Sequence, residues 1–146
     1  MPPTDRPIYE TQADRVRQAV AIRTLAKATK SEAVPTESLA RWDYEMRRNG
    51  VVAAIVEVKC RNCRMSHHQT YMIGLAKALR LRQAALELKV AGVLLVAWQD
   101  GTGWLRVDVG NHEDWQTGMG GRTDRNDPMD TEPVAHFPVA WFRMLP

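Results

Sequence analysis

The stretch RWDYEMRRNGVVAAIVEVK, residues 41–59, decides the fold of this chain. Residues 40–47 alternate apolar and polar or charged side chains, as a strand with one buried face does. Residues 51–59 are almost wholly apolar until their last three positions, which is typical of a central strand covered on both faces. Because Asn49-Gly50 lies between the two segments and is a hairpin signal, the stretch predicts an antiparallel β-hairpin.

The length of the turn decides which side chains share a face of this hairpin. A two-residue loop at Asn49-Gly50 sets Asp43 opposite Val56 and turns Glu57 to the other face. A three-residue loop over residues 48–50 instead sets Asp43 opposite Ile55, on the face that also carries Glu57 and Lys59. We expect the three-residue loop, or a bulge that has the same effect.

The rest of the chain is read from hydrophobic spacing and turn residues, and it predicts a single α/β domain over residues 1–146. We expect a mixed, mainly four-stranded sheet flanked by helices, with a core of about residues 10–109 and a C-terminal loop and tail over 110–146. Strand 51–59, a crossover helix and strand 93–98 can form a right-handed parallel unit. The further expected elements are a helix over 11–29, a loop over 31–38, a helix over 67–89 capped by Ser66-His67-His68-Gln69, a strand beginning near 104, a surface loop over 110–133 and an apolar segment over 134–142.

Composition limits the classes of function. The chain has 146 residues, 45% of them hydrophobic and 25% charged, which is ordinary for a globular protein with its own core. A net charge of +3 is compatible with a polyanionic partner. We expect no membrane span, because no apolar run approaches ~20 residues. The N-terminus lacks a signal-peptide pattern, so the expected location is the cytoplasm.

Asp43, Glu57 and Lys59 are the residues that point to chemistry. Hydrolysis of a phosphodiester needs charge neutralisation at the phosphate, an activated water and a stabilised leaving oxygen, and Mg²⁺ held by one or two carboxylates supplies these. Asp43 and Glu57 are the candidate ligands of Mg²⁺ or Mn²⁺, with the backbone carbonyl of Val58 as a further ligand. The ammonium of Lys59 can orient the water or stabilise developing charge.

This arrangement resembles the PD-(D/E)xK nuclease superfamily, with a restriction-endonuclease-like fold. Asp43 and the Glu57-Val58-Lys59 motif carry the resemblance, within a helix–strand–turn–strand–helix–strand order over residues 10–109. The helix expected at Tyr71 to Leu88, which carries Lys77, is similar to that of phage-encoded and resolvase-like branches.

The resemblance implies a metal-dependent endo- or exonuclease that acts on nucleic acid, most readily DNA. A homodimer is one arrangement by which such enzymes cut two strands, and a phage-encoded member would act in the host cytoplasm. Many members carry an acidic metal ligand on the first helix. Here Gln18 stands where we would look for it, Glu10 and Asp14 lie earlier, and Glu10 is the residue that we carry over as a metal ligand.

Basic residues close to the motif are candidates for contacts with a nucleic-acid backbone. Arg61 and Arg64 follow Lys59 in the chain, and Lys77 lies on the expected second helix. A solvated amphipathic helix face is the alternative for Lys77 and its neighbours.

Three alternatives to a nuclease remain open at this point. Asp43 and Glu57 can be ordinary strand carboxylates, with Glu57 paired to Lys59 or Arg41. The chain can be a non-catalytic module of the same fold that binds nucleic acid or assembles with other proteins. It can also be a small zinc-binding interaction module, whose ligands would be Cys60, Cys63, His67 and His68.

Overall fold

The structure is a computed structural model that describes residues 12–37, 41–121 and 131–146. Its α-helices are α1 (Gln12–Thr29) and α2 (Leu75–Leu88), and its short 3₁₀ turns are η1 (Met65–His67), η2 (His112–Asp114) and η4 (Val139–Trp141). The strands are β1 (Glu32–Pro35), β2 (Tyr44–Arg48), β3 (Val51–Cys60), β4 (Thr70–Gly74), β5 (Ala91–Trp98), β6 (Gly101–Arg106), β7 (Gln116–Gly121), β8 (Thr131–Pro138) and β9 (Arg143–Met144).

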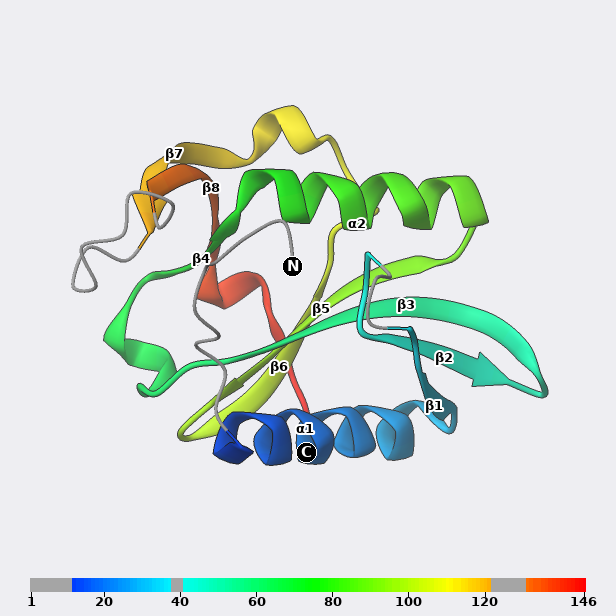
Figure 1. Cartoon of the computed structure of the whole chain (residues 1–146). Helices are drawn as coiled ribbons and strands as arrows, with labels where there is room; N and C mark the ends of the chain where they lie inside the picture. Colours follow the sequence, from blue (N-terminus) through cyan, green and yellow to red (C-terminus); the bar gives the residue numbers. More distant parts are fainter. Residues whose placement is uncertain (1–11, 38–40, 122–130) are drawn as a thin grey trace, which may run out of the picture.

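A mixed six-stranded sheet in the order β1-β2-β3-β5-β6-β9 forms the centre of the fold. Helix α1 covers one of its faces and helix α2 covers the other (Figure 1). A second, three-stranded sheet in the order β4-β8-β7 packs beside the N-terminal half of α2. The α/β class is therefore confirmed, but the prediction of four strands in the main sheet is wrong.

The two extra strands of the main sheet lie at its edges, where sequence signals are weakest. β1 pairs with β2 in a segment that we expected to be a loop, and it ends at Pro35. Proline is tolerated there because an edge strand does not need every backbone N–H for pairing. β9 adds only a two-residue pairing to β6 at the other edge.

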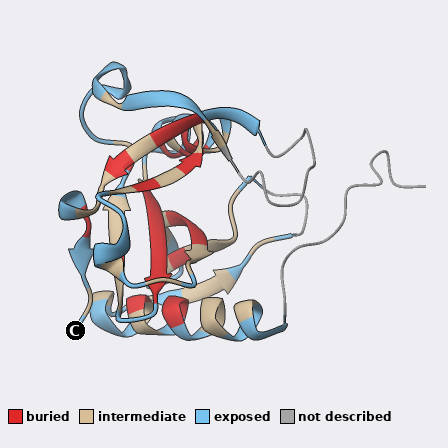
Figure 2. Ribbon diagram, turned by 90° about the vertical axis from the view of Figure 1, so that its left-hand side faces the viewer, coloured by how far each residue is buried: buried red, intermediate tan, exposed pale blue. Residues whose placement is uncertain are grey.

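The centre of the main sheet is the pair β3 and β5, which run parallel as predicted. Each of these strands is buried on both faces, which explains its nearly continuous apolar sequence. α1 packs Ala21, Ile22 and Leu25 against one face, and α2 packs residues such as Leu81 and Ala85 against the other. Figure 2 shows this buried layer between the two helices.

Close approach of α2 to the sheet depends on Gly92, at the start of β5. A Cβ atom at this position would lie 2.8 Å from the Cβ of Ala85, so only glycine fits without displacing the helix. We had no sequence signal for this contact.

The prediction of a helix over 67–89 is wrong in its first part. α2 begins at Leu75 with Gly74 as its N-cap, and Ser66-His67-His68-Gln69 does not cap it. Residues 70–74 instead form β4, in which Tyr71 and Ile73 are buried and pair with β8. The alternating burial of this strand explains the difference, because a partner strand far along the chain competes successfully with helix propensity.

The prediction of a surface loop over 110–133 is wrong for residues 116–121 and 131–133, which form strands, whereas residues 110–115 lie outside any strand. β7 and the first residues of β8 pair with each other from Gln116↔His136 to Gly121↔Thr131. The apolar segment over 134–142 then continues β8 and enters the core through Val134, Ala135 and Phe137. Within the described residues, neither α-helix has the length and apolar character needed to cross a membrane.

Candidate active site

The β2–β3 hairpin sets Asp43 directly opposite Glu57 on one face of the sheet, but its turn and register differ from those that we expected. The turn has two residues, Asn49 and Gly50, both with positive φ, so the three-residue loop is wrong. A β-bulge between Met46 and Arg47 then shifts the register by one residue. Tyr44 consequently pairs with Val56, and continuing the register sets Asp43 opposite Glu57. The equivalent bulge that we allowed for is therefore what the chain uses.

Asp43 lies one residue before β2 and is anchored to β3 at two points. Its backbone N–H donates to the carbonyl of Val56 over 2.9 Å, and its Oδ2 accepts the N–H of Val58 over 2.8 Å. Burial raises the pKa of Asp43, and the neighbouring charge of Glu57 raises it further. The position of this carboxylate is thus fixed, although burial and the charge of Glu57 disfavour its ionised form.

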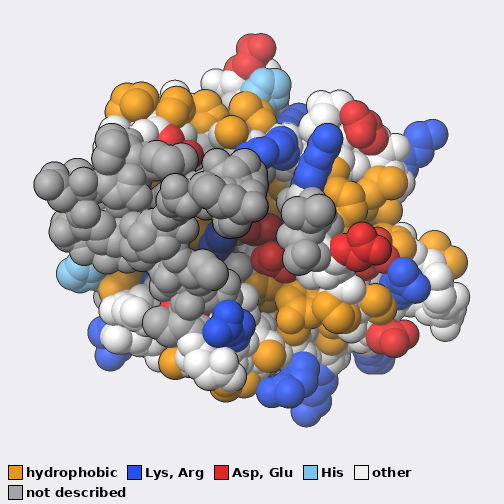
Figure 3. All heavy atoms as spheres, in the orientation of Figure 1, with side chains coloured by type: hydrophobic (Ala, Val, Ile, Leu, Met, Phe, Trp, Pro, Cys, Tyr) orange, Lys and Arg blue, Asp and Glu red, His pale blue; other side chains and the backbone are white. Residues whose placement is uncertain are grey.

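Glu57 is the buried centre of the site, with an exposed fraction of 4%. Its Oε1 lies 3.4 Å from Nζ of Lys59 and 3.0 Å from Nζ of Lys77. Lys59 comes from the same strand two residues later, whereas Lys77 reaches across from the first turn of α2. A buried carboxylate is costly without such partners, so the two ammonium groups stabilise its charge. Figure 3 shows acidic and basic side chains adjoining one another between α2 and the central sheet.

The pKa values of the two lysines are shifted in opposite directions, that of Lys59 downward and that of Lys77 upward. Burial lowers the pKa of Lys59, and the nearby charge of Lys77 lowers it further, against the attraction of Glu57. Burial by itself also lowers the pKa of Lys77, but the charge and hydrogen bond of Glu57 outweigh it, so the pKa of Lys77 is raised. Lys77 is therefore the cation that stays charged, and Lys59 is the one that releases a proton more readily.

The donor set at Asp43 and Glu57 fits a hard divalent cation. Mg²⁺ and Mn²⁺ prefer oxygen ligands and are held by one or two carboxylates with water at the remaining positions. The N–H of Val58 points at Asp43, and the N–H and C=O of one strand residue point to the same side. The carbonyl of Val58 therefore faces the same space as Asp43, as a third oxygen donor would.

A cavity of about 860 Å³ adjoins the two lysines that pair with Glu57, whereas Asp43, Glu57 and Val58 do not line it. Its lining includes Lys59 and Lys77, the neighbouring arginines Arg61, Arg64 and Arg80, and residues of β4 and β8. Gln18 and Asp14 of α1 also line it. The excess of cationic side chains makes the cavity suited to a polyanion.

Arg61, Arg64 and Lys77, which we predicted as contacts for a nucleic-acid backbone, differ in their surroundings. Arg61 is held in the fold, because its Nη2 donates to the carbonyl of Met72 over 2.8 Å and its guanidinium stacks on the ring of Tyr71. Arg64 projects outward, with 71% of its side chain exposed and Asp100 3.8 Å away. Lys77, which we predicted as a contact for nucleic acid or as part of a solvated helix face, forms an ion pair with the carboxylate of Glu57.

The zinc interpretation is wrong for the residues on which it rested. Among the described residues, no group of three or more His, Cys, Asp or Glu side chains is placed to hold a metal ion. Cys60 and Cys63 are not joined in a disulfide, and His67 and His68 contact each other edge to face. Glu10, the carry-over for a metal ligand on the first helix, lies outside the described residues.

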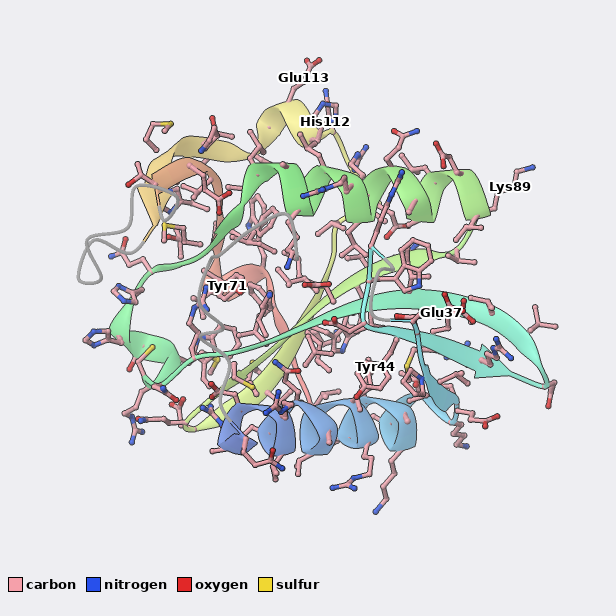
Figure 4. The ribbon with its side chains drawn as sticks, viewed as in Figure 1. Glu37, Tyr44, Tyr71, Lys89, His112 and Glu113 are labelled. Carbon is pink, nitrogen blue, oxygen red and sulfur yellow. The ribbon has the colours of Figure 1, made fainter. Side chains whose placement is uncertain are left out.

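Tyr71 is a residue at the cavity that sequence reasoning missed as a site component. It is the second residue of β4 (Figure 4), and it is 3% exposed. Its hydroxyl has no hydrogen-bond partner among the described residues, and burial raises its pKa to about 12. No local pattern identifies this residue, because its place depends on the pairing of β4 with β8.

The fold and the facing acidic groups together define the class of protein. A helix, a hairpin that sets an Asp opposite a Glu-x-Lys, a second helix and a parallel strand form the arrangement of PD-(D/E)xK nucleases. A family model described as "Phage putative PDDEXK endonuclease" matches residues 4–145. The chain belongs to this family, which confirms the predicted phage-type membership. A search of curated proteins found no match.

Proposed function

We propose that this chain is a metal-dependent endonuclease that hydrolyses phosphodiester bonds in DNA. Membership of a phage endonuclease family supports nucleic-acid cleavage as the class of activity. The single observation that carries the proposal is the convergence of Asp43, Glu57 and Lys59 at one point beside a cationic cavity. In this proposal Asp43, Glu57 and the carbonyl of Val58 hold Mg²⁺ or Mn²⁺.

The division of labour follows from the surroundings of each group. When bound, the divalent cation supplies charge neutralisation at the phosphate and activation of a water molecule. The Asp43 carboxylate is oriented by the N–H of Val58, which limits the geometries in which it can serve as a ligand. Burial of Glu57 keeps bulk water from competing for its oxygen atoms.

Lys59 has the role of handling a proton or a developing charge next to the reacting phosphate. Its pKa is lowered by burial and by Lys77, so it gives up its proton more readily than an ordinary lysine and, once neutral, can accept a proton from the attacking water. Its charged form can instead stabilise the oxygen atoms of the phosphate as negative charge develops on them. Either role requires Nζ of Lys59 to lie in the cavity, of which it is a lining residue.

A nuclease panel tests this proposal. Purified protein is incubated with supercoiled, linear duplex, branched and single-stranded DNA, and with RNA, in the presence of Mg²⁺, Mn²⁺ or EDTA. We expect cleavage of DNA that depends on the metal and falls at least about a hundredfold in Lys59→Met. The matched control is Lys27→Met, an exposed lysine of α1 whose loss removes the same charge away from the cavity. Equal cleavage by Lys59→Met and Lys27→Met would refute the role of Lys59.

The second candidate function is a non-catalytic module that binds nucleic acid with the same surface. The observation in its favour is that the neutral Gln18 lines the cavity at the part of α1 where a metal ligand is expected, while the carboxylate that α1 brings to the cavity, Asp14, lies one turn earlier. Metal-independent DNA binding with no cleavage of any substrate in the panel would select this alternative.

The pairing of two chains into a homodimer stays a prediction. Sedimentation of the protein with and without duplex DNA checks it.

A further inference from the structure

Lys77 makes the shortest ion pair in the candidate site, although the nuclease motif does not include it. Its Nζ lies 3.0 Å from Oε1 of Glu57, whereas Nζ of Lys59 lies 3.4 Å from the same oxygen. The lysine of the motif is thus not the main partner of the buried glutamate. A cation from another element, α2, takes that place.

The position of Lys77 in its helix is unfavourable by itself. It is the third residue of α2, in a first turn that contains no acidic side chain. The N-terminus of a helix carries partial positive charge, which disfavours a cation there. The pairing with Glu57 offsets this disadvantage, so the interaction with the site accounts for a lysine at this position.

The four charged groups of the site balance one another. Asp43 and Glu57 bring two negative charges when ionised, and Lys59 and Lys77 bring two positive charges, so their sum is zero. One divalent cation makes the cluster about +2, which matches the roughly two negative charges of a phosphodiester at its transition state. Two divalent cations would give about +4 beside a single phosphate, in a site whose positive charge is already supplied by lysines.

We propose that the ammonium of Lys77 stands in for a second metal ion, so that the Asp43–Glu57 site takes a single divalent cation. This inference rests on the proposed function, because it concerns the same carboxylates. Lys77 acts through Glu57 as a positioning residue: it holds Oε1 and places a fixed positive charge where a second cation would lie. Among the described residues no cluster of three acidic or other metal-binding side chains is present to hold two ions.

Metal binding without turnover provides the test. Mn²⁺ is titrated into the full-length protein by calorimetry, and free Mn²⁺ is followed by electron paramagnetic resonance. We expect one Mn²⁺ per wild-type chain, and a dissociation constant at least tenfold lower in Lys77→Met, because the variant removes a cation that repels the metal. Lys77→Arg should keep the wild-type affinity, and the exposed control Lys27→Met should not change it.

The outcomes separate this inference from the proposed function. Two Mn²⁺ ions per wild-type chain, or an affinity for Mn²⁺ that is the same in Lys77→Met and the wild type, would overturn the role of Lys77. Those results would leave the nuclease proposal standing as long as the wild type cleaves DNA. One tightly bound Mn²⁺ with the expected response to Lys77→Met, but no cleavage of DNA, would support the inference and reject turnover.

Cleavage kinetics give a second readout that a purely structural role would not produce. The dependence of the rate on Mg²⁺ should have a Hill slope near one in the wild type. In Lys77→Met we expect kcat to fall at least tenfold with little change in KM for DNA, and Lys77→Arg to recover most of that loss. A rise in KM with unchanged kcat would show that Lys77 only grips the nucleic-acid backbone, and would contradict the proposal.

Discussion

Asp43 and Asp108 are two aspartates of the central sheet whose surroundings act on their charge in opposite directions. Asp108 accepts hydrogen bonds from Nε and Nη2 of Arg106 and from the N–H of Gly92. Burial by itself raises the pKa of Asp108, but these donors outweigh burial and hold it below the usual range. Asp43 has one backbone donor and the charge of Glu57 beside it, and its pKa is raised.

The difference distinguishes Asp108, whose charged carboxylate stabilises the fold, from Asp43, whose charged carboxylate does not. At Asp108 the hydrogen bonds from Arg106 and Gly92 outweigh burial and favour the ionised form, so that ionisation stabilises the native state. At Asp43 two like charges are brought together at a cost that a bound cation would remove. A pKa that is raised by burial and by a like charge is a pattern that functional sites show.

The largest effect that this comparison predicts is the loss of cleavage in Asp43→Asn. The amide oxygen can still accept the N–H of Val58, so the local structure is kept while the proposed metal ligand loses its charge. We expect cleavage of supercoiled DNA to fall at least about a hundredfold. Thermal unfolding should show stability that is unchanged or raised, because repulsion from Glu57 is relieved. A lowered melting temperature in this variant would place Asp43 with the structural carboxylates.

Asp108→Asn should have the opposite outcome, with stability lost and cleavage kept. The variant removes the charge that Arg106 pairs with and weakens three hydrogen bonds at a side chain that is 8% exposed. We expect the free energy of unfolding to fall by about 1–2 kcal/mol in urea titrations. Cleavage measured well below the melting temperature should equal that of the wild type. The exposed control Glu113→Gln should change neither property.

The pH dependence of stability should distinguish the two aspartates again. Because its folded pKa is lowered, Asp108 contributes stability that is present above its unfolded pKa and is lost as pH falls through the folded value. Asp43 has a raised folded pKa, so it reduces stability as pH rises from the unfolded value through the folded one. Urea titrations between pH 3 and pH 7 should therefore show two trends. As the pH falls, Asp108→Asn should approach the wild type in its free energy of unfolding from below. Asp43→Asn should approach it from above, because its greater stability at pH 7 disappears once Asp43 of the wild type is protonated.

Tyr71→Phe is expected to have the smallest effect on stability. The ring keeps its edge-to-face contacts with Trp98 and Phe142, and the variant removes a buried hydroxyl that has no partner. An unsatisfied buried polar group is unfavourable, so we expect stability to be unchanged or raised by up to about 1 kcal/mol. A clear loss of stability in urea titrations would mean that the hydroxyl forms a hydrogen bond in solution.

The hairpin and its acidic residues could be predicted from the sequence because they depend on local signals. Alternation over 40–47, the Asn49-Gly50 turn and the apolar run of β3 each have a direct structural meaning. The bulge that brings Asp43 opposite Glu57 could be named only as an alternative to a longer turn. Ala53, the extra residue between the pairs Met46↔Ala54 and Arg47↔Val52, has nothing in its sequence context to mark it.

The parts that could not be predicted depend on contacts between distant segments. β4 looked like the start of a helix because its partner β8 lies 60 to 68 residues away along the chain. The true start of α2 at Leu75 is what places Lys77 in the first turn, beside Glu57. From the sequence, Lys77 was a candidate contact for a nucleic-acid backbone as a basic residue of the expected second helix, and nothing there placed it beside Glu57.

The most direct test of the account is plasmid cleavage by three variants that each neutralise one carboxylate: Asp43→Asn, Glu57→Gln and Asp108→Asn. Each protein is purified to the folded state, and nicking and linearisation of supercoiled DNA are timed in Mg²⁺ and in EDTA. We predict that the wild type and Asp108→Asn cut in Mg²⁺ alone, while Asp43→Asn and Glu57→Gln do not cut. Cleavage by Asp43→Asn and Glu57→Gln at the wild-type rate would contradict the assignment of the Asp43–Glu57 pair as the active site.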